Sequence, residues 1–183
     1  MKVLGISGSP RAGNTEWMVK TVLGAINRAG IETELLLIRK LDIRLCTGCL
    51  TCEAGGKDRK GICKLPDDMN VIYPKILAAD GLLLGTPAYF ELLSGMLKNF
   101  IDRTCAIWPR LEGKYMAGVS VAEEGVGAAI DNLKTYATLC KMSWVGDVTT
   151  LAKTPKEASK NSKLEKELEL LGQKFSQVLN KQI

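Results

Sequence analysis

Cysteine is the residue type in this chain with the clearest capacity for chemistry. Three cysteines are spaced as C-x2-C-x2-C, and a fourth follows after ten further residues. Three thiolates this close together are how ferredoxins hold a four-iron cubane, whose fourth ligand is free to come from farther along the chain. Zinc sites more often use separated cysteine pairs, and a thioredoxin-like site needs only one pair. The spacing predicts a 4Fe-4S cluster, with zinc or unligated thiols as alternatives; the ligands would be Cys46, Cys49, Cys52 and Cys63.

Histidine is absent from the sequence. This removes the usual general base and the commonest metal ligand, and it excludes zinc-histidine and Rieske-type sites. The chemistry must therefore rest on a cofactor, on cysteine or on oxygen groups. The other two of the six cysteines, Cys105 and Cys140, fall on predicted helices and are expected to be small core residues.

A second candidate site lies near the N-terminus, where the apolar run 2–7 ends in the turn-rich sequence 8–15. A strand, a loop of small residues and a helix N-terminus together form an anion site, because free backbone N–H groups and the helix dipole favour negative charge. The loop is neither a P-loop nor a Gly-x-Gly-x-x-Gly fingerprint. Its hydroxyls and one arginine suit a terminal phosphate monoester, although an ordinary turn that binds nothing also uses Gly, Ser and Pro. The candidate ligands are Ser7, Ser9, Arg11, Asn14 and Thr15.

Short apolar strands alternate with amphipathic helices along the rest of the chain. The predicted strands cover residues 2–7, 31–38, 82–86, 115–122 and 143–151. The predicted helices begin at the Thr15 cap, after Pro66, at the Ser94 cap, after Gly127 and in the C-terminal region that contains Leu164 and Phe175. This alternation predicts one α/β domain over residues 1–183, a doubly wound five-stranded parallel sheet of flavodoxin-like order 2-1-3-4-5, with ligands at the carboxyl ends of the strands.

The segment 39–70 interrupts this pattern and contains four of the cysteines. A loop of this length without periodicity is unusual inside a compact domain. A cluster that binds four points of the segment would remove much of its conformational freedom, which explains how such a loop is kept.

The N-terminal loop resembles the phosphate loop of the flavodoxin-like NADPH-dependent FMN reductases and iron-sulfur flavoproteins, through Gly5–Arg11 and Gly13–Thr15. The resemblance covers the chain up to its final helix. It implies that Ser7, Ser9, Arg11, Asn14 and Thr15 hold the FMN 5′-phosphate. Iron-sulfur flavoproteins also carry a compact cysteine motif after the second strand, although their last spacing is usually shorter than the ten residues found here.

The same resemblance implies where the flavin ring lies. The loop after the third strand would border the isoalloxazine, and the glycine-rich loop after the fourth strand would close over it. The alternative for Tyr89 and Phe90, which the phosphate loop upstream disfavours, is that they are plain core aromatics. Glu123 and Glu124 depart from the family pattern and receive no role. The implied ring contacts are Pro87, Ala88, Tyr89, Phe90, Ala122, Gly125 and Gly127.

Composition limits the partners and the compartment. A chain of 183 residues with 46% hydrophobic content suits one packed domain. The net charge of +5 comes mostly from lysines on helices that also carry glutamates, so we expect neither nucleic-acid nor membrane binding. No apolar run is long enough to span a bilayer and no signal peptide is evident, so a cytoplasmic location is expected.

The predicted function is that of an iron-sulfur flavoprotein, with electrons passing from a one-electron donor such as ferredoxin through the cluster to FMN and on to a small two-electron acceptor. The alternatives are an NAD(P)H-dependent FMN or quinone reductase without a cluster, and a zinc-stabilised binding module without activity. An apolar loop at 89–93 and the family resemblance predict a homodimer or homotetramer. Basic residues around Cys63 would attract an acidic donor, against the alternative of a merely solvated loop: Lys57, Arg59, Lys60 and Lys64.

Overall fold

A parallel sheet forms the centre of the chain. In a computed structural model, which describes residues 1–53, 63–125 and 127–181, five long strands are parallel neighbours in the order β2-β1-β3-β5-β6. Their bounds are β1 Lys2–Ser7, β2 Glu32–Leu37, β3 Gly81–Tyr89, β5 Tyr115–Ala122 and β6 Ser143–Leu151. This is the flavodoxin-like order predicted from the sequence, so the predicted fold class is confirmed.

A sixth, two-residue strand corrects the prediction of a loop after the third strand. β3 continues to Tyr89 and pairs in antiparallel fashion with β4, Leu92–Leu93. The residues between them, Phe90 and Glu91, have φ values of 50° and 63°. Two left-handed residues form the turn whose twist matches a tight β-hairpin. Residues 87–89 therefore belong to a strand, which holds their backbone more firmly than a loop would.

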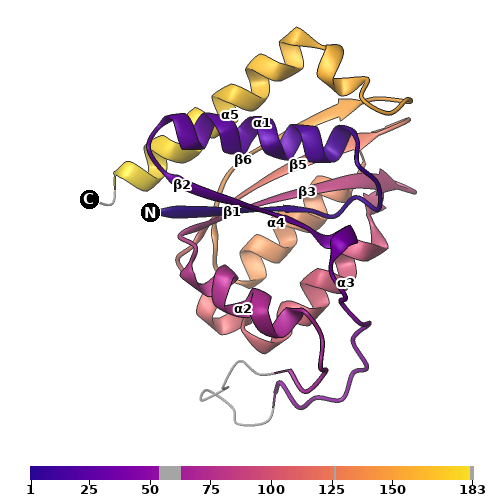
Figure 1. Cartoon of the computed structure of the whole chain (residues 1–183), viewed down its shortest axis with the longest axis vertical. Coiled ribbons are helices and arrows are strands. Elements are labelled where there is room, and N and C mark those ends of the chain that lie inside the picture. Colours follow the sequence, from indigo (N-terminus) through magenta and orange to yellow (C-terminus); the bar gives the residue numbers. More distant parts are fainter. Residues whose placement is uncertain (54–62, 126, 182–183) are drawn as a thin grey trace.

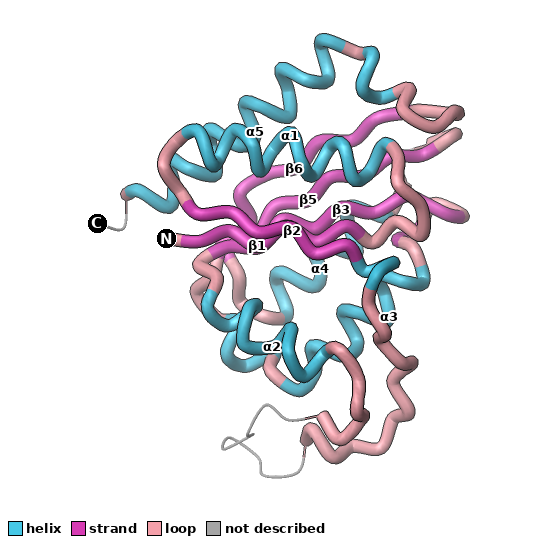
Figure 2. The backbone as a smooth tube through the Cα atoms, viewed as in Figure 1, coloured by secondary structure: helices cyan, strands magenta, loops and turns pink. Residues whose placement is uncertain are grey.

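Helices cover both faces of the sheet (Figure 1). α1 and α5 pack against one face, and α2, α3 and α4 lie on the other, as the three layers in Figure 2 show. Two buried apolar clusters fill the spaces between the layers. The bounds are α1 Asn14–Arg28, α2 Met69–Ala78, α3 Gly95–Arg103, α4 Ala129–Leu139 and α5 Ser162–Asn180. Short 3-10 helices lie at η1 Ile38–Lys40, η3 Thr104–Ala106, η4 Trp108–Leu111 and η5 Ala158–Lys160.

The start of α1 differs from the prediction. Thr15 was expected to cap the helix, but it lies inside the first turn, and the N-cap is Gly13. No side chain in the described chain caps this helix. The N–H groups of its first turn therefore remain available to a ligand.

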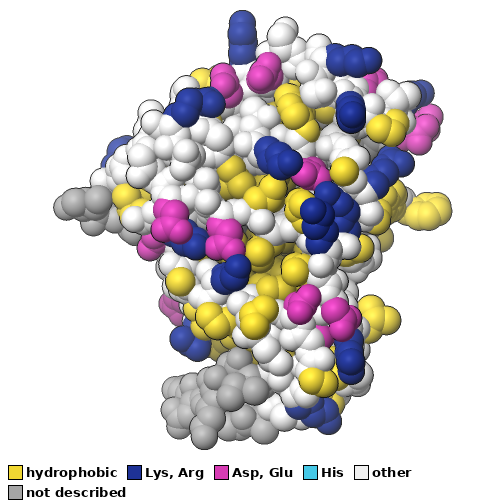
Figure 3. Space-filling model, in the orientation of Figure 1, with side chains coloured by type: hydrophobic (Ala, Val, Ile, Leu, Met, Phe, Trp, Pro, Cys, Tyr) yellow, Lys and Arg dark blue, Asp and Glu magenta, His cyan; other side chains and the backbone are white. Residues whose placement is uncertain are grey.

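The surface carries charges of both signs. On the face shown in Figure 3, Lys and Arg side chains lie among Asp and Glu side chains rather than in one patch. Within the described residues, no helix combines the length and apolar composition that crossing a membrane requires.

Candidate functional site

A hollow of about 100 Å³ lies where the parallel strands end. It is bordered by the last residues of β3 and β5, by segments that follow β1, β5 and β6, and by the start of α1, as expected for a doubly wound sheet. Its predicted lining residues are Ser9, Arg11, Asn14, Thr15, Pro87, Ala88, Tyr89 and Ala122. The fold thus brings together eight residues from three separate stretches of sequence.

The segment after β6 was missed by the sequence reasoning. Ala152, Lys153 and Pro155 also line the hollow, and Lys153 adds a second cationic side chain beside Arg11. The available signal was positional, because residues beyond the end of the last parallel strand must reach the same edge of the sheet.

The phosphate-loop residues occupy different environments. Ser9 Oγ donates a hydrogen bond of 2.8 Å to the Arg11 carbonyl oxygen, which shapes the loop. The Asn14 amide donates to the Thr154 carbonyl oxygen at 2.9 Å and accepts from the Ala158 N–H at 3.2 Å, so it fastens α1 to the segment after β6. Ser7 is fully buried outside the lining, and its hydroxyl has no hydrogen-bond partner among the described residues.

A second hollow adjoins the first and shares Ala88, Tyr89 and Glu123 with it. Phe90 and Glu91 of the β3–β4 turn border it. This open region lies between the hairpin and the loop after β5. Phe90, predicted as a ring contact, borders this second hollow rather than the first.

Gly125 and Gly127 do not line either hollow but determine how closely the two loops approach. Both have positive φ, and a Cβ atom at Gly127 would lie 2.3 Å from Cβ of Glu91. A side chain there would push the loop after β5 away from the hairpin. The sequence predicted a close approach of these glycines to a flavin, whereas the neighbour that they approach in the structure is Glu91 of the hairpin.

The cysteines border a separate, larger hollow of about 640 Å³. All six cysteines line it, together with apolar residues of α3, α4 and the chain after α3. Cys46 and Cys49 are exposed, whereas Cys52 and Cys63 are half-buried. No three Cys, Asp or Glu side chains within the described residues are grouped closely enough to hold a metal ion.

Cys105 corrects a prediction, whereas Cys140 agrees with one. Cys140 is buried and packs in the core, as expected. Cys105 is half-buried and lies in η3 beside the cysteine segment, so it is a lining residue rather than a core residue. Burial, followed by the neighbouring Cys105 thiol, raises the pKa of Cys52 to about 11. By contrast, hydrogen bonds from the Thr51 side chain and backbone lower the pKa of Cys49 to about 7.

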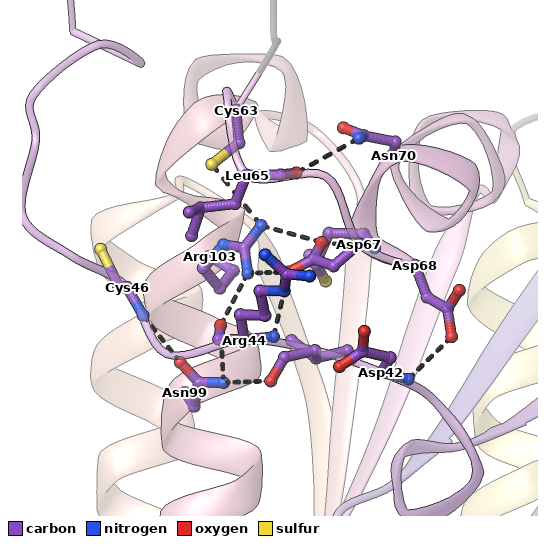
Figure 4. Close-up of polar contacts among 12 residues, drawn as sticks. Asp42, Arg44, Cys46, Cys63, Leu65, Asp67, Asp68, Asn70, Asn99 and Arg103 are labelled. Carbon is purple, nitrogen blue, oxygen red and sulfur yellow. Dashed lines mark hydrogen bonds and ion pairs between the residues drawn. The ribbon is translucent and has the colours of Figure 1, made fainter.

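A buried ion pair fixes one part of the cysteine segment to α3 (Figure 4). Arg103, the last residue of α3, contacts both carboxylate oxygens of Asp67 at 2.5 and 3.0 Å. The side chains are 1% and 0% exposed. Burial opposes ionisation of Asp67, but the Arg103 guanidinium and the N–H groups of Arg44 and Met69 outweigh it and lower the pKa of this carboxyl. Ionised Asp67, which follows Cys63, therefore links Arg44, which precedes Cys46, to Arg103 at the end of α3.

Asn99 lies one turn before Arg103 on the same helix and holds the part of the segment around Arg44 and Cys46. Its side-chain oxygen accepts the Cys46 N–H at 3.2 Å, and its amide donates to the carbonyl oxygens of Ile43 and Arg44. In Figure 4, Asn99 lies next to the backbone of Cys46 and Arg103 lies nearer to Cys63 and Asp67. Cys46 is thus fixed through its backbone while its thiol remains exposed. The sequence reasoning assigned no role to Asn99, Arg103 or Asp67, because their partners are distant in sequence.

Comparison with known structures supports the fold. A solved NADH:FMN oxidoreductase in its apo form has a TM-score of 0.73 at 18% identity, with 97% of this chain and 89% of that chain covered. A flavodoxin from the domain Archaea gives a TM-score of 0.70 at 16% identity, with 98% and 99% covered.

Comparison of sequences identifies relatives. An iron-sulfur flavoprotein of Methanocaldococcus jannaschii is 37% identical over 153 residues, which cover 80% of this chain and 77% of that protein. One from Methanosarcina thermophila is 31% identical over 80% of this chain and 78% of its own length. Two from Archaeoglobus fulgidus are covered over only 49% and 56% of their lengths, at 35% and 38% identity and over 57% and 69% of this chain. The model of the NADPH-dependent FMN reductase family matches residues 1–156. With its flavodoxin-like sheet and its hollow at the strand ends, the chain belongs to this family of flavin-dependent oxidoreductases.

Proposed function

We propose that the chain binds FMN at the strand-end hollow and a 4Fe-4S cluster at the cysteine-lined hollow. It would accept electrons from a one-electron donor such as ferredoxin and deliver them to a small two-electron acceptor. When bound, FMN supplies two-electron chemistry and the cluster supplies one-electron chemistry.

The observation that carries FMN binding is the uncapped N-terminus of α1 at a hollow lined by two cationic side chains. Arg11 and Lys153 would neutralise a phosphate dianion, while the N–H groups of the first turn donate hydrogen bonds to it. Ser9, through its bond to the Arg11 carbonyl oxygen, holds the loop around that position. The buried hydroxyl of Ser7, which lacks a partner among the described residues, supports a further polar group bound nearby.

The cysteines available as ligands support an iron-sulfur cluster. Four cysteines of the segment line one hollow with mostly apolar neighbours, as thiolate-bound clusters require. Cys46, Cys49, Cys52 and Cys63 would be the ligands. The anchoring of the segment by Asn99 and Arg103 supports a fixed site rather than a solvated loop.

One observation favours a second candidate function. No three metal-binding side chains in the described part of the chain are grouped around one point, and the matched family is described as NADPH-dependent. An NAD(P)H-dependent FMN or quinone reductase without a cluster would need only the strand-end hollow. The two candidates share FMN and differ in the electron donor and in the presence of a cluster.

Anaerobic purification after reconstitution with iron and sulfide tests both candidates. Flavin bands with a broad shoulder, iron near four per chain and reduction by ferredoxin would support the first proposal. Flavin bands without iron, and reduction by NADH or NADPH, would support the second. A colourless protein that retains zinc would contradict both and favour a binding module.

A further inference from the structure

The buried carboxylate of Asp67 orients the guanidinium of Arg103. Nη1 donates to Asp67 Oδ2 and to the Arg44 carbonyl oxygen at 2.7 Å. Nη2 donates to Asp67 Oδ1 and to Cys63 Sγ at 3.5 Å. Nε has no partner among the described residues. The planar fork is thus locked in one orientation, and that orientation places one charged N–H against the sulfur of Cys63.

A buried ion pair is poor evidence of stability, because desolvation of both charges offsets much of their attraction. Arg103 and Asp67 could be replaced by apolar side chains if they served packing alone. What an apolar pair could not provide is a charged hydrogen bond to a thiolate. Hydrogen bonds to ligand sulfurs raise the reduction potential of iron-sulfur sites, and outer contacts of this kind retain the metal.

The hollow contains a competing thiol. Cys105 follows α3, lies beside Cys52 and points its thiol towards Glu53 Oε1 at 4.0 Å. From sequence spacing alone, either Cys63 or Cys105 could complete the three-cysteine motif. The two differ in their surroundings, because the guanidinium of Arg103 donates to Cys63, whereas Cys105 lies beside the Cys52 thiol and the Glu53 carboxylate. A negatively charged sulfur is stabilised by the guanidinium and destabilised by the carboxylate.

We propose that Arg103, oriented by Asp67, is a positioning residue that makes Cys63 the fourth ligand of the cluster and leaves Cys105 unligated. The inference rests on the proposed cluster. It adds that the charged hydrogen bond to Cys63 slows iron loss and raises the reduction potential of the site.

The main test uses the double variant R103Q/D67N, which removes both charges together so that neither is left buried alone. Its FMN content, circular dichroism and melting temperature should match those of the wild type. Its iron should be lost to a chelator about 10-fold faster, and its midpoint potential should shift to lower values. R103K, which keeps the charge but not the fork, should recover part of the potential shift.

A matched control is K98Q on the same helix. Lys98 forms an exposed ion pair with Asp102 and is 59% exposed. This variant should leave iron loss and potential unchanged. A double variant that equals the wild type in both quantities would overturn the proposal. So would a double variant that loses iron faster but keeps the wild-type potential, because a pair that only anchors the segment affects retention and not the potential.

Single cysteine variants test the choice of ligand. After reconstitution, C105S should keep the electron paramagnetic resonance signal of the reduced four-iron cluster, and C63S should lose it. The opposite result would overturn the assignment to Cys63. A wild-type protein that takes up no iron would instead overturn the proposed function itself, so the two failures are distinguishable.

Discussion

Ser94 Oγ donates a hydrogen bond of 2.6 Å to the carbonyl oxygen of Gly8. Ser94 Oγ also accepts a hydrogen bond from the Leu97 N–H at 3.1 Å, so Ser94 both caps the N-terminus of α3 and holds the phosphate loop. The loop also packs closely against α3, because a Cβ atom at Gly8 would lie 2.5 Å from Cβ of Leu97. One hydroxyl therefore links the start of α3 to the proposed phosphate site.

Replacing Ser94 by Ala should lower the free energy of unfolding by about 1–2 kcal/mol, because the buried Leu97 N–H and the Gly8 carbonyl oxygen both lose their hydrogen-bond partner. FMN affinity should fall as well, since the Gly8 carbonyl loses its support. Urea unfolding of the FMN-free protein and an FMN titration measure the two effects. S94T, which keeps the oxygen, is the control and should lie between the wild type and S94A. An S94A variant as stable as the wild type would show that the cap is dispensable.

Replacing Arg11 by Ala should weaken FMN binding by about 1.5–3 kcal/mol, because a charged hydrogen bond to the phosphate is lost. Binding of riboflavin, which lacks the phosphate, should change little. Isothermal titration calorimetry with both ligands tests this. Equal affinity of the wild type for FMN and riboflavin would contradict a phosphate site.

Replacing Asp67 by Asn should lower the free energy of unfolding at pH 7 by about 3–5 kcal/mol, because the Arg103 charge is left buried without its partner. The folded-state pKa of Asp67 is depressed, so its contribution is present above its unfolded pKa of about 3.9 and is lost as the pH falls below that value. The difference between wild type and D67N should therefore shrink in denaturant titrations near pH 3. D102N removes an exposed carboxylate from α3 and should have little effect at either pH. A difference that is independent of pH would mean that Asp67 is not ionised in the folded protein.

We predict that the protein forms a homodimer or homotetramer, and that replacing Phe90 by Asn shifts it towards monomer. Phe90 is 100% exposed at the tip of the hairpin and has a left-handed backbone, which Asn adopts more readily. The variant should thus fold at least as well while losing an apolar contact with a second copy. Light scattering at micromolar concentration measures the change. L170S, which removes a 61% exposed leucine from α5, should leave the association unchanged. A monomeric wild type would contradict the prediction.

Reduction by ferredoxin should slow markedly as salt is added, because basic residues near Cys63 would attract an acidic donor. Lys57, Arg59 and Lys60 lie outside the described residues, so this prediction rests on the sequence. Changing these three residues to Gln should flatten the salt dependence while FMN and iron content stay constant. Stopped-flow rates across a salt series provide the measurement. Rates that respond neither to salt nor to the triple substitution would exclude this surface as the docking site.

The strand order and most of the strand-end hollow could be predicted from sequence, because continuous apolar runs and small-residue turns are local signals. The hairpin at Phe90 and Glu91 could not, since neither residue type favours a left-handed turn. Lys153 was missed because its loop bears no motif, and Cys105 because a helical position resembles a core position in sequence. The ion pair of Arg103 and Asp67 joins residues that are 36 apart, and only the packing of α3 beneath the segment brings them together.

Helix α3 touches the phosphate loop at its first turn and the cysteine segment at its last. Ser94 holds Gly8, while Asn99 and Arg103 hold the segment. If local opening of α3 weakens both attachments, the two proposed sites are thermodynamically linked. Occupation of either one then raises the affinity of the other by the same factor. Loading with FMN would favour cluster assembly, and a chain lacking one cofactor would retain the other less firmly. Nine residues of helix would thus couple the maturation of one redox centre to the presence of its neighbour.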